Sequence, residues 1–371
     1  MDPIVLWQHK WSADLFIPTY LFLGGLTGGV FVIAALADLL GIKFQRFAYV
    51  SRLAAFIAVP ILALAGFFLT VHLGKPERGL GFPLFFTNYN SWMTRGGWIV
   101  GASAPLVVLY AALWYFRVFP GLRRTLALIG IPLLALFSFY TGLLLSGAWY
   151  VPLWSEKYLP TLFLTSGLTT GVAAVGLIFL LALPFLGQTV ENPRRVLRGF
   201  GVVLVLLILV ELYEVRAFMI YLAGRAPDKA VTETTPTGEF QAAMGSRLAY
   251  EYVTGGEGYP LKLFKGAAAE AADTLIPRKT LAPWFWWGII GTGLTIPLLL
   301  TLFEFAADRY SRSQGLVNKV RGVKFALVLI GGFLLRVVIV WGGDLKAPLP
   351  YPPSMWQIPG IGGPPIPGLG G

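Results

Sequence analysis

The stretch Gly25-Leu26-Thr27-Gly28-Gly29-Val30 lies in the middle of the first long apolar run of this protein, Asp14–Leu40. A helix that crosses a bilayer needs about 20 mostly apolar residues, so this run predicts a transmembrane helix. The apolar core of a cleaved signal peptide is only about 7–15 residues long. We therefore interpret the first run as a span that is retained in the mature protein.

Seven more runs of similar length follow it. The eight predicted spans lie near Asp14–Leu40, Phe47–Leu73, Gly97–Phe116, Thr125–Ala148, Tyr158–Leu186, Arg198–Leu222, Trp284–Ala306 and Val323–Gly343. Of the 371 residues, 56% are hydrophobic and only 13% are charged, whereas soluble proteins carry about 25% charged residues. We predict an all-α membrane protein with eight transmembrane helices.

The glycine-rich signature of the first span returns in the fifth as Gly167-Leu168-Thr169-Thr170-Gly171-Val172. Both copies lie in odd-numbered spans and point the same way across the bilayer, which favours two parallel four-helix bundles. Coincidence among common membrane residues is the alternative. The predicted domains are 1–148 for the first bundle, 149–343 for the second bundle with an extramembrane insertion at 223–283, and 344–371 for a Pro/Gly-rich tail.

The formal net charge of +11 reflects orientation in the membrane rather than nucleic-acid binding, because cytoplasmic loops are enriched in lysine and arginine. The loops after the odd-numbered spans hold most of these residues: Lys43, Arg46, Arg117, Arg123, Arg124, Arg194, Arg195, Arg309, Arg312, Lys319 and Arg321. We predict that this face is cytoplasmic. Both termini and the long connection 223–283 are then extracytoplasmic.

The sequence is poor in metal ligands. It has no cysteine, which excludes disulfides, thiolate-bound iron–sulfur clusters and covalently attached haem in this protein. Its only histidines are His9 and His72, so a bis-histidine haem is geometrically conceivable but disfavoured, and zinc lacks ligands. We expect no haem or metal, so any redox chemistry here needs an organic carrier and a cofactor held by a partner.

Polar and aromatic residues gather at the predicted outer face. They come from His72–Gly79, from Ser91–Trp98, from Tyr140-Thr141-Gly142, and from Asp14 and Tyr20 near the start of the first span. A quinone head group requires hydrogen-bond donors to its two carbonyls, and its tail requires apolar helices. An ordinary interfacial belt of aromatic residues is the alternative.

The motifs of this face resemble those of the NrfD-like, or polysulfide reductase membrane-subunit, family. His72-Leu73-Gly74-Lys75-Pro76-Glu77-Arg78 together with Ser91-Trp92-Met93-Thr94-Arg95-Gly96-Gly97-Trp98 is similar to the family pattern of the second and third spans. Tyr140–Ser146 with Pro152-Leu153-Trp154 resembles its span-four motif. Phe22–Gly29 and Leu335–Val340 are similar to its first and last spans, so the resemblance extends over all eight.

The resemblance implies an eight-span subunit without metal cofactors, in the cytoplasmic (inner) membrane of a prokaryote, which binds menaquinone or ubiquinone. It implies a ferredoxin-like partner with four iron–sulfur clusters, and usually a molybdopterin catalytic subunit. Tyr140 matches the family's quinone-contacting tyrosine, and His72 borders the site. Tyr20 aligns with a histidine of some relatives, and Asp14 would replace a polar contact that aligns near Ile17.

Charged residues give the remaining candidate roles. Lys75, Arg78 and Arg95 would tune the charge of the head group or contact the partner. Charges at membrane depth usually pair or conduct protons. The residues considered for a proton path are Glu211, Glu214, Arg336 and Glu304. Ion pairs such as Glu211–Arg336 are the structural alternative. An interfacial position is a further alternative for Glu304, and we expect Asp38 to be interfacial.

The sequence thus predicts a quinone-binding membrane subunit of an oxidoreductase complex, with proton translocation as an additional option. Such a subunit is not catalytic by itself. A secondary transporter is one competing interpretation, although its polar groups would gather near the midplane rather than at one face. An inert membrane anchor of a redox complex is the other.

Overall fold

The computed structural model describes residues 15–44, 46–72, 88–148, 151, 153–186, 192–224, 249–256, 280–310 and 314–344. The regular structure of these residues is helical throughout, without strands. The helices are α1 (Phe16–Gly41), α2 (Arg46–His72), α4 (Trp92–Phe116), α5 (Pro120–Ser146), α6 (Leu159–Leu186), α7 (Pro193–Gly224), the π-helix η7 (Trp284–Thr295) with α10 (Ile296–Tyr310), α11 (Gln314–Trp341) and the short η8 (Gly342–Asp344). Eight of these segments, with η7 and α10 as one, are long and apolar enough to span a membrane, which confirms the predicted fold class.

The apolar runs form helices because hydrocarbon offers no partner for backbone polar groups, so each span must satisfy its hydrogen bonds internally. Capping residues then fix the ends of some helices. The side chain of Ser91 accepts a hydrogen bond from the Met93 amide, 3.2 Å away, and starts α4. Arg117 and Phe119 adopt left-handed φ angles of 58° and 48°, which makes the turn into α5 sharp.

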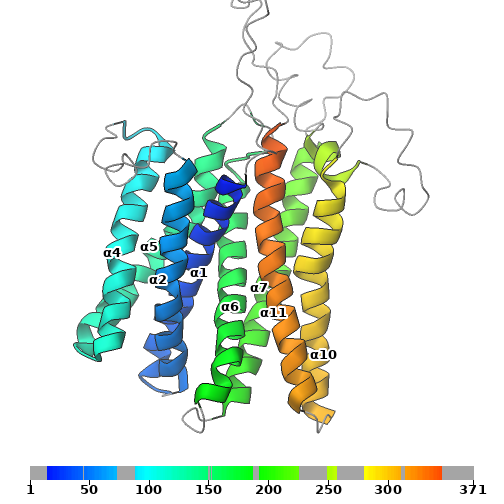
Figure 1. Cartoon of the computed structure of the whole chain (residues 1–371). Coiled ribbons are helices and arrows are strands. Elements are labelled where there is room, and N and C mark those ends of the chain that lie inside the picture. The colour runs from blue at the N-terminus through cyan, green and yellow to red at the C-terminus, as the bar shows by residue number, and fades with distance from the viewer. Residues whose placement is uncertain are drawn as a thin grey trace, which may run out of the picture.

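The helices stand side by side, and α1 begins at the same end at which α11 finishes (Figure 1). The short turns from α1 to α2 and from α4 to α5 lie at the other end, with the basic residues that the sequence assigned to the cytoplasm. We call this other end the arginine-rich end. Which end faces the cytoplasm stays a prediction.

Helix α1 is the central helix of the described structure. It packs against α2, α5, α6 and α11. In an apolar stretch of 18 residues within α1, 78% of the residues are buried, compared with 28% in the corresponding stretch of α2. The two glycine signatures meet here: a Cβ added to Gly29 would lie 1.9 Å from the carbonyl oxygen of Gly167. The repeated glycines therefore serve close packing. The division into two bundles stays a prediction, because α1 packs on α6 as well as on α2 and α5.

Part of the long connection before η7 is described. Residues 249–254 form a short helix, and the carbonyl of Thr254 accepts a hydrogen bond from the Trp286 indole at 2.9 Å. Burial, and secondarily the Asp344 carboxylate, raises the pKa of the Tyr252 phenol. This segment therefore lies against the end of the helical domain. The rest of the insertion and the tail after residue 344 fall outside the described residues.

Candidate functional site

Two tyrosines lie together at the end opposite the arginine-rich end. Tyr20 comes from the first turns of α1 and Tyr140 from the last turns of α5, and each side chain is only 3% exposed. The two phenols are close enough to interact electrostatically. Neither hydroxyl hydrogen-bonds to any residue in the described part of the protein. Two donors are therefore available to a ligand.

Helix α4 completes the surroundings of Tyr140. Gly96, in its second turn, packs against the phenol so closely that an added Cβ would lie 1.8 Å from the hydroxyl oxygen of Tyr140. Three helices, α1, α4 and α5, thus converge on the pair of hydroxyls. A glycine at position 96 is required for this arrangement, since any side chain there would occupy the space of the ring.

An apolar cavity of about 270 Å³ adjoins Tyr20. Its other lining residues come from α5, α2 and α4: Phe137, Val59, Leu62, Ala63, Ala65, Gly66, Leu69, Val100, Ala104 and Val108. Ala63 and Val108 are exposed on the surface of the bundle, so the cavity opens sideways between α2 and α4. A cavity of roughly 150 Å³ already accommodates benzene, so this one can hold a substituted ring and the beginning of a tail.

The other residues predicted at this site are dispersed or undescribed. His72 ends α2 and is partly buried, one turn beyond the cavity-lining Leu69. Arg95 is exposed, donates to the carbonyl oxygen of Tyr89 at 2.7 Å and stacks over Trp92. Asp14, Lys75 and Arg78 lie outside the described residues. The structure thus brings together the two tyrosines of the predicted set.

A second polar group lies in the interior, around Arg336 of α11. The guanidinium is 1% exposed, donates to the Ser166 hydroxyl at 2.5 Å and to the carbonyl of Phe163 at 3.0 Å, and stacks on the Phe163 ring. Glu211 of α7 lies close to Ser166 and Thr169, and its Oε2 atom has no hydrogen-bond partner among the described residues. Arg336 and Glu211 form no direct ion pair within the described structure. The two charges nevertheless lie near enough to attract each other, so charge pairing of Glu211 with Arg336 stays the alternative to a proton path.

The four residues considered for a proton path fall into two separate groups. Glu214 is half-buried and lies near Thr165 and Glu211. Glu304, in contrast, accepts from Arg321 at 2.7 Å and from Lys324, and all three side chains are fully buried. Two cations of α11 therefore neutralise the carboxylate of Glu304 inside the protein, and its depth in the membrane stays a prediction.

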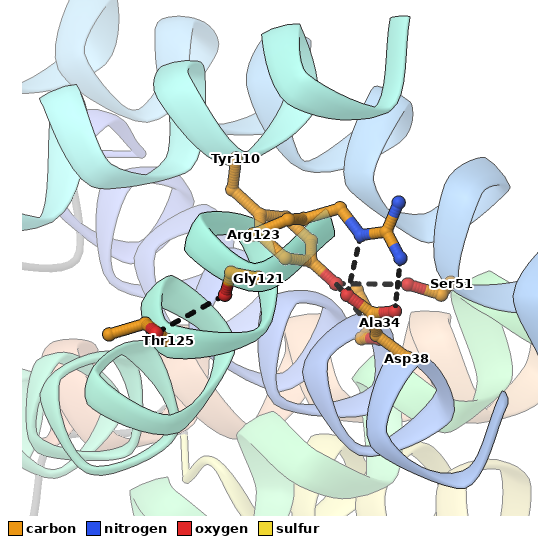
Figure 2. A network of polar contacts seen from close by, with 7 residues as sticks. All are labelled: Ala34, Asp38, Ser51, Tyr110, Gly121, Arg123 and Thr125. Atoms are coloured by element: carbon orange, nitrogen blue, oxygen red, sulfur yellow. Dashed lines mark hydrogen bonds and ion pairs between the residues drawn. The ribbon is translucent and has the colours of Figure 1, made fainter. Parts of the chain in front are cut away.

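A further buried network was missed in the sequence. In Figure 2, the guanidinium of Arg123 donates two hydrogen bonds to the carboxylate of Asp38 in α1, with nitrogen–oxygen distances of 2.8 Å. The Tyr110 hydroxyl donates to the same carboxylate, and its oxygen lies within hydrogen-bond distance, 3.0 Å, of the Ser51 hydroxyl oxygen. Asp38 is 2% exposed, so its carboxylate is enclosed by protein, while its interfacial depth stays a prediction. The charge in an otherwise apolar helix was the available signal, but its partner is 85 residues away.

No group of three or more histidine, cysteine, aspartate or glutamate side chains gathers within the described ranges. His9, the other candidate haem ligand, lies outside them.

Comparison with known proteins gives one consistent family. Residues 8–347 match the family model described as polysulphide reductase, NrfD. The sequence is 25% identical over 348 residues to the C subunit of polysulfide reductase from Wolinella succinogenes, covering 88% of the present protein and 93% of that subunit. It is 24% identical over 365 residues to the NrfD homolog of Haemophilus influenzae, covering 90% and 94%. Because the family model extends over nearly the whole sequence, this protein belongs to the NrfD polysulphide reductase family.

Proposed function

We propose that this protein exchanges electrons between menaquinone or ubiquinone and an iron–sulfur partner. Family membership makes it a membrane subunit of a redox complex, and the quinone role is the finer step. The observation that carries it is the pair of tyrosine hydroxyls, Tyr20 and Tyr140, which have no partner among the described residues. Tyr20 also lines an apolar cavity that opens sideways. Burial without a hydrogen-bond partner is costly for a hydroxyl, so these two groups are suited to a ligand that supplies acceptors.

A quinone fits both parts of the site. Its carbonyl oxygens accept hydrogen bonds from phenols, and its prenyl tail prefers apolar helix faces to water. Reduction to the quinol adds two electrons and two protons to the ring. The tyrosines hold the head group, while the cavity between α2 and α4 receives it directly from the lipid phase.

The relatives suggest the rest of the assembly. The name of the Wolinella succinogenes relative makes it one subunit of a reductase that is built from several. We infer a ferredoxin-like four-cluster subunit docked near Arg95, Lys75 and Arg78, and a molybdopterin subunit beyond it. In this proposal the tyrosine end faces outward from the inner membrane of a prokaryote. His72 and Asp14 border the same rim.

Substitution of Tyr140 by phenylalanine tests the quinone role. Tyr140→Phe removes one hydroxyl but keeps the ring that packs on Gly96, so a quinone loses one neutral hydrogen bond, worth about 1 kcal/mol or about 5-fold in affinity. The affinity of the purified protein for a menaquinone analogue should fall by that factor, and Tyr20→Phe should act similarly.

Tyr115→Phe is the matched control, since Tyr115 is 67% exposed on α4 near the arginine-rich end. Unchanged affinity in both test variants would contradict the proposal. It would leave an inert anchor, or a transporter with its site elsewhere, as the better interpretation.

Proton transfer to the quinone is the second part of the proposal. Arg336 extends toward α1, where its Nη2 lies 3.2 Å from the Cβ position of Gly25. The guanidinium donates to Ser166, which lies near Glu211, and the neighbouring Thr165 lies near Glu214. We infer that protons move along this group, whereas the saturated Glu304 cluster serves mainly to pair charges.

Glu211→Gln keeps the shape of the side chain but cannot ionise. In proteoliposomes of the assembled complex, we expect proton uptake coupled to quinone reduction to fall at least about tenfold, because a proton carrier is removed. Quinone affinity should be unchanged. Glu156→Gln, an exposed position on the connection before α6, is the control. Normal uptake in Glu211→Gln would remove Glu211 from the path.

A further inference from the structure

Three arginines near the arginine-rich end carry an N–H group that has no acceptor in the part of the protein that the structure describes. The Nε–H groups of Arg46, Arg52 and Arg124 are buried, and none of them has a hydrogen-bond partner among the described residues. None of the three side chains forms an ion pair with a described residue either. Their neighbour Arg123 differs, because the carboxylate of Asp38 satisfies it through two contacts.

Aromatic rings hold two of these guanidinium groups in place. Arg46 lies over the rings of Phe44 and Phe47, at 5.0 and 5.3 Å, and Arg52 lies over Phe56 at 5.5 Å. Stacking on a ring occupies the flat face of a guanidinium and leaves its N–H edge available for a bidentate acceptor such as phosphate. The rings therefore hold the guanidinium groups of Arg46 and Arg52 in position before an anion binds.

Their depth restricts what can neutralise them. Six residues of helix separate Arg46 from Arg52, which is about 9 Å along α2 at 1.5 Å per residue. Arg52 therefore lies nearly two turns further along α2 than Arg46, and a buried N–H without an acceptor is unfavourable there. At this end of α1, α2, α4 and α5, the described carboxylate is Asp38, and Arg123 already occupies it. An external anion must approach from the side of the bundle.

We propose that Arg46 and Arg52 bind the phosphate groups of anionic phospholipids. The surroundings favour a lipid over a soluble anion, because Ile42 and Phe44 beside these arginines are 60% and 41% exposed and offer an apolar surface for acyl chains. Basic positions at membrane surfaces attract anionic head groups. This site lies at the opposite end from the tyrosines and does not depend on the quinone proposal.

A lipid-retention experiment on purified full-length protein tests this site. The variant Arg46→Gln/Arg52→Gln removes two charges, and the control Arg195→Gln/Lys319→Gln removes two exposed charges from other turns of the same end, for which no ring contact is seen. Wild type and control should retain phosphatidylglycerol after detergent washing and gain thermal stability when it is added. In the test variant, retained phosphatidylglycerol should fall by roughly half or more.

Three results would overturn the proposal. One is equal retention in the test variant and wild type. Another is equal loss in both double variants, which would show a general effect of surface charge. The third is an equal gain in stability from inorganic phosphate or from phosphatidylcholine vesicles, which would exclude a specific anionic lipid. If the test variant does not fold, titration of wild-type protein with the three additives still separates these outcomes.

Discussion

Tyr140 can lie against α4 because residue 96 has no side chain. A Cβ at Gly96 would be 1.6 Å from the Cζ atom of Tyr140, which is far inside van der Waals contact. The glycine at position 96 therefore leaves the space on α4 that the Tyr140 phenol occupies. The candidate quinone site therefore depends on the glycine at position 96 as much as on the two tyrosine hydroxyls.

Gly96→Ala should accordingly displace the Tyr140 ring and impair the site. We expect at least the fivefold loss of quinone affinity predicted for Tyr140→Phe, since the whole phenol moves and not only its hydroxyl. Equilibrium titration with a quinone analogue measures the effect. Gly121→Ala on the same helix as Tyr140 is the control, because an added Cβ there has no neighbour within 4 Å. Wild-type affinity in Gly96→Ala would show that Tyr140 is not part of the site.

At the scale of helices, the contacts of α1 with α6 and with α5 depend on glycines. The Cβ position of Gly171 lies 2.4 Å from the carbonyl carbon of Gly29, and that of Gly28 lies 2.1 Å from the Ser138 hydroxyl. Without a hydrophobic driving force between helices in lipid, close backbone packing is a main source of association. The Ser138 hydroxyl also donates to the carbonyl of Gly25 at 3.0 Å. This part of the structure therefore tolerates little added volume.

Gly29→Ala should destabilise the protein by about 1–3 kcal/mol, the usual range for overpacking a tight core. A lower midpoint of thermal unfolding in detergent would report the change. Gly199→Ala in α7 has open space around the new methyl group and should be neutral or slightly stabilising. Equal stability of both variants would mean that the two helices separate without cost, contrary to the packing described here.

For the whole molecule, the even number of spans places the start of α1 and the end of α11 on one side (Figure 1). The positive-inside rule predicts that the arginine-rich end is cytoplasmic. Because the sequence has no cysteine, a single introduced thiol reports its own side of the membrane without background labelling.

Phe119→Cys, at the exposed turn between α4 and α5, should resist a membrane-impermeant maleimide in intact cells and react after the membrane is permeabilised. Tyr89→Cys, exposed just before α4, should react in intact cells. The reverse pattern would invert the topology. It would also place the tyrosine site, and any partner subunit near it, on the cytoplasmic side.

The sequence by itself determined the eight spans and their class, because hydropathy and length respond to the membrane rather than to neighbouring residues. The motifs also selected Tyr20 and Tyr140. Tertiary structure decided which charges meet: Asp38 pairs with Arg123, Glu304 pairs with Arg321, and Glu211 lies near Arg336. Such pairs depend on how helices rotate and approach, and that geometry is set by glycine contacts between segments more than 100 residues apart, which no local pattern records.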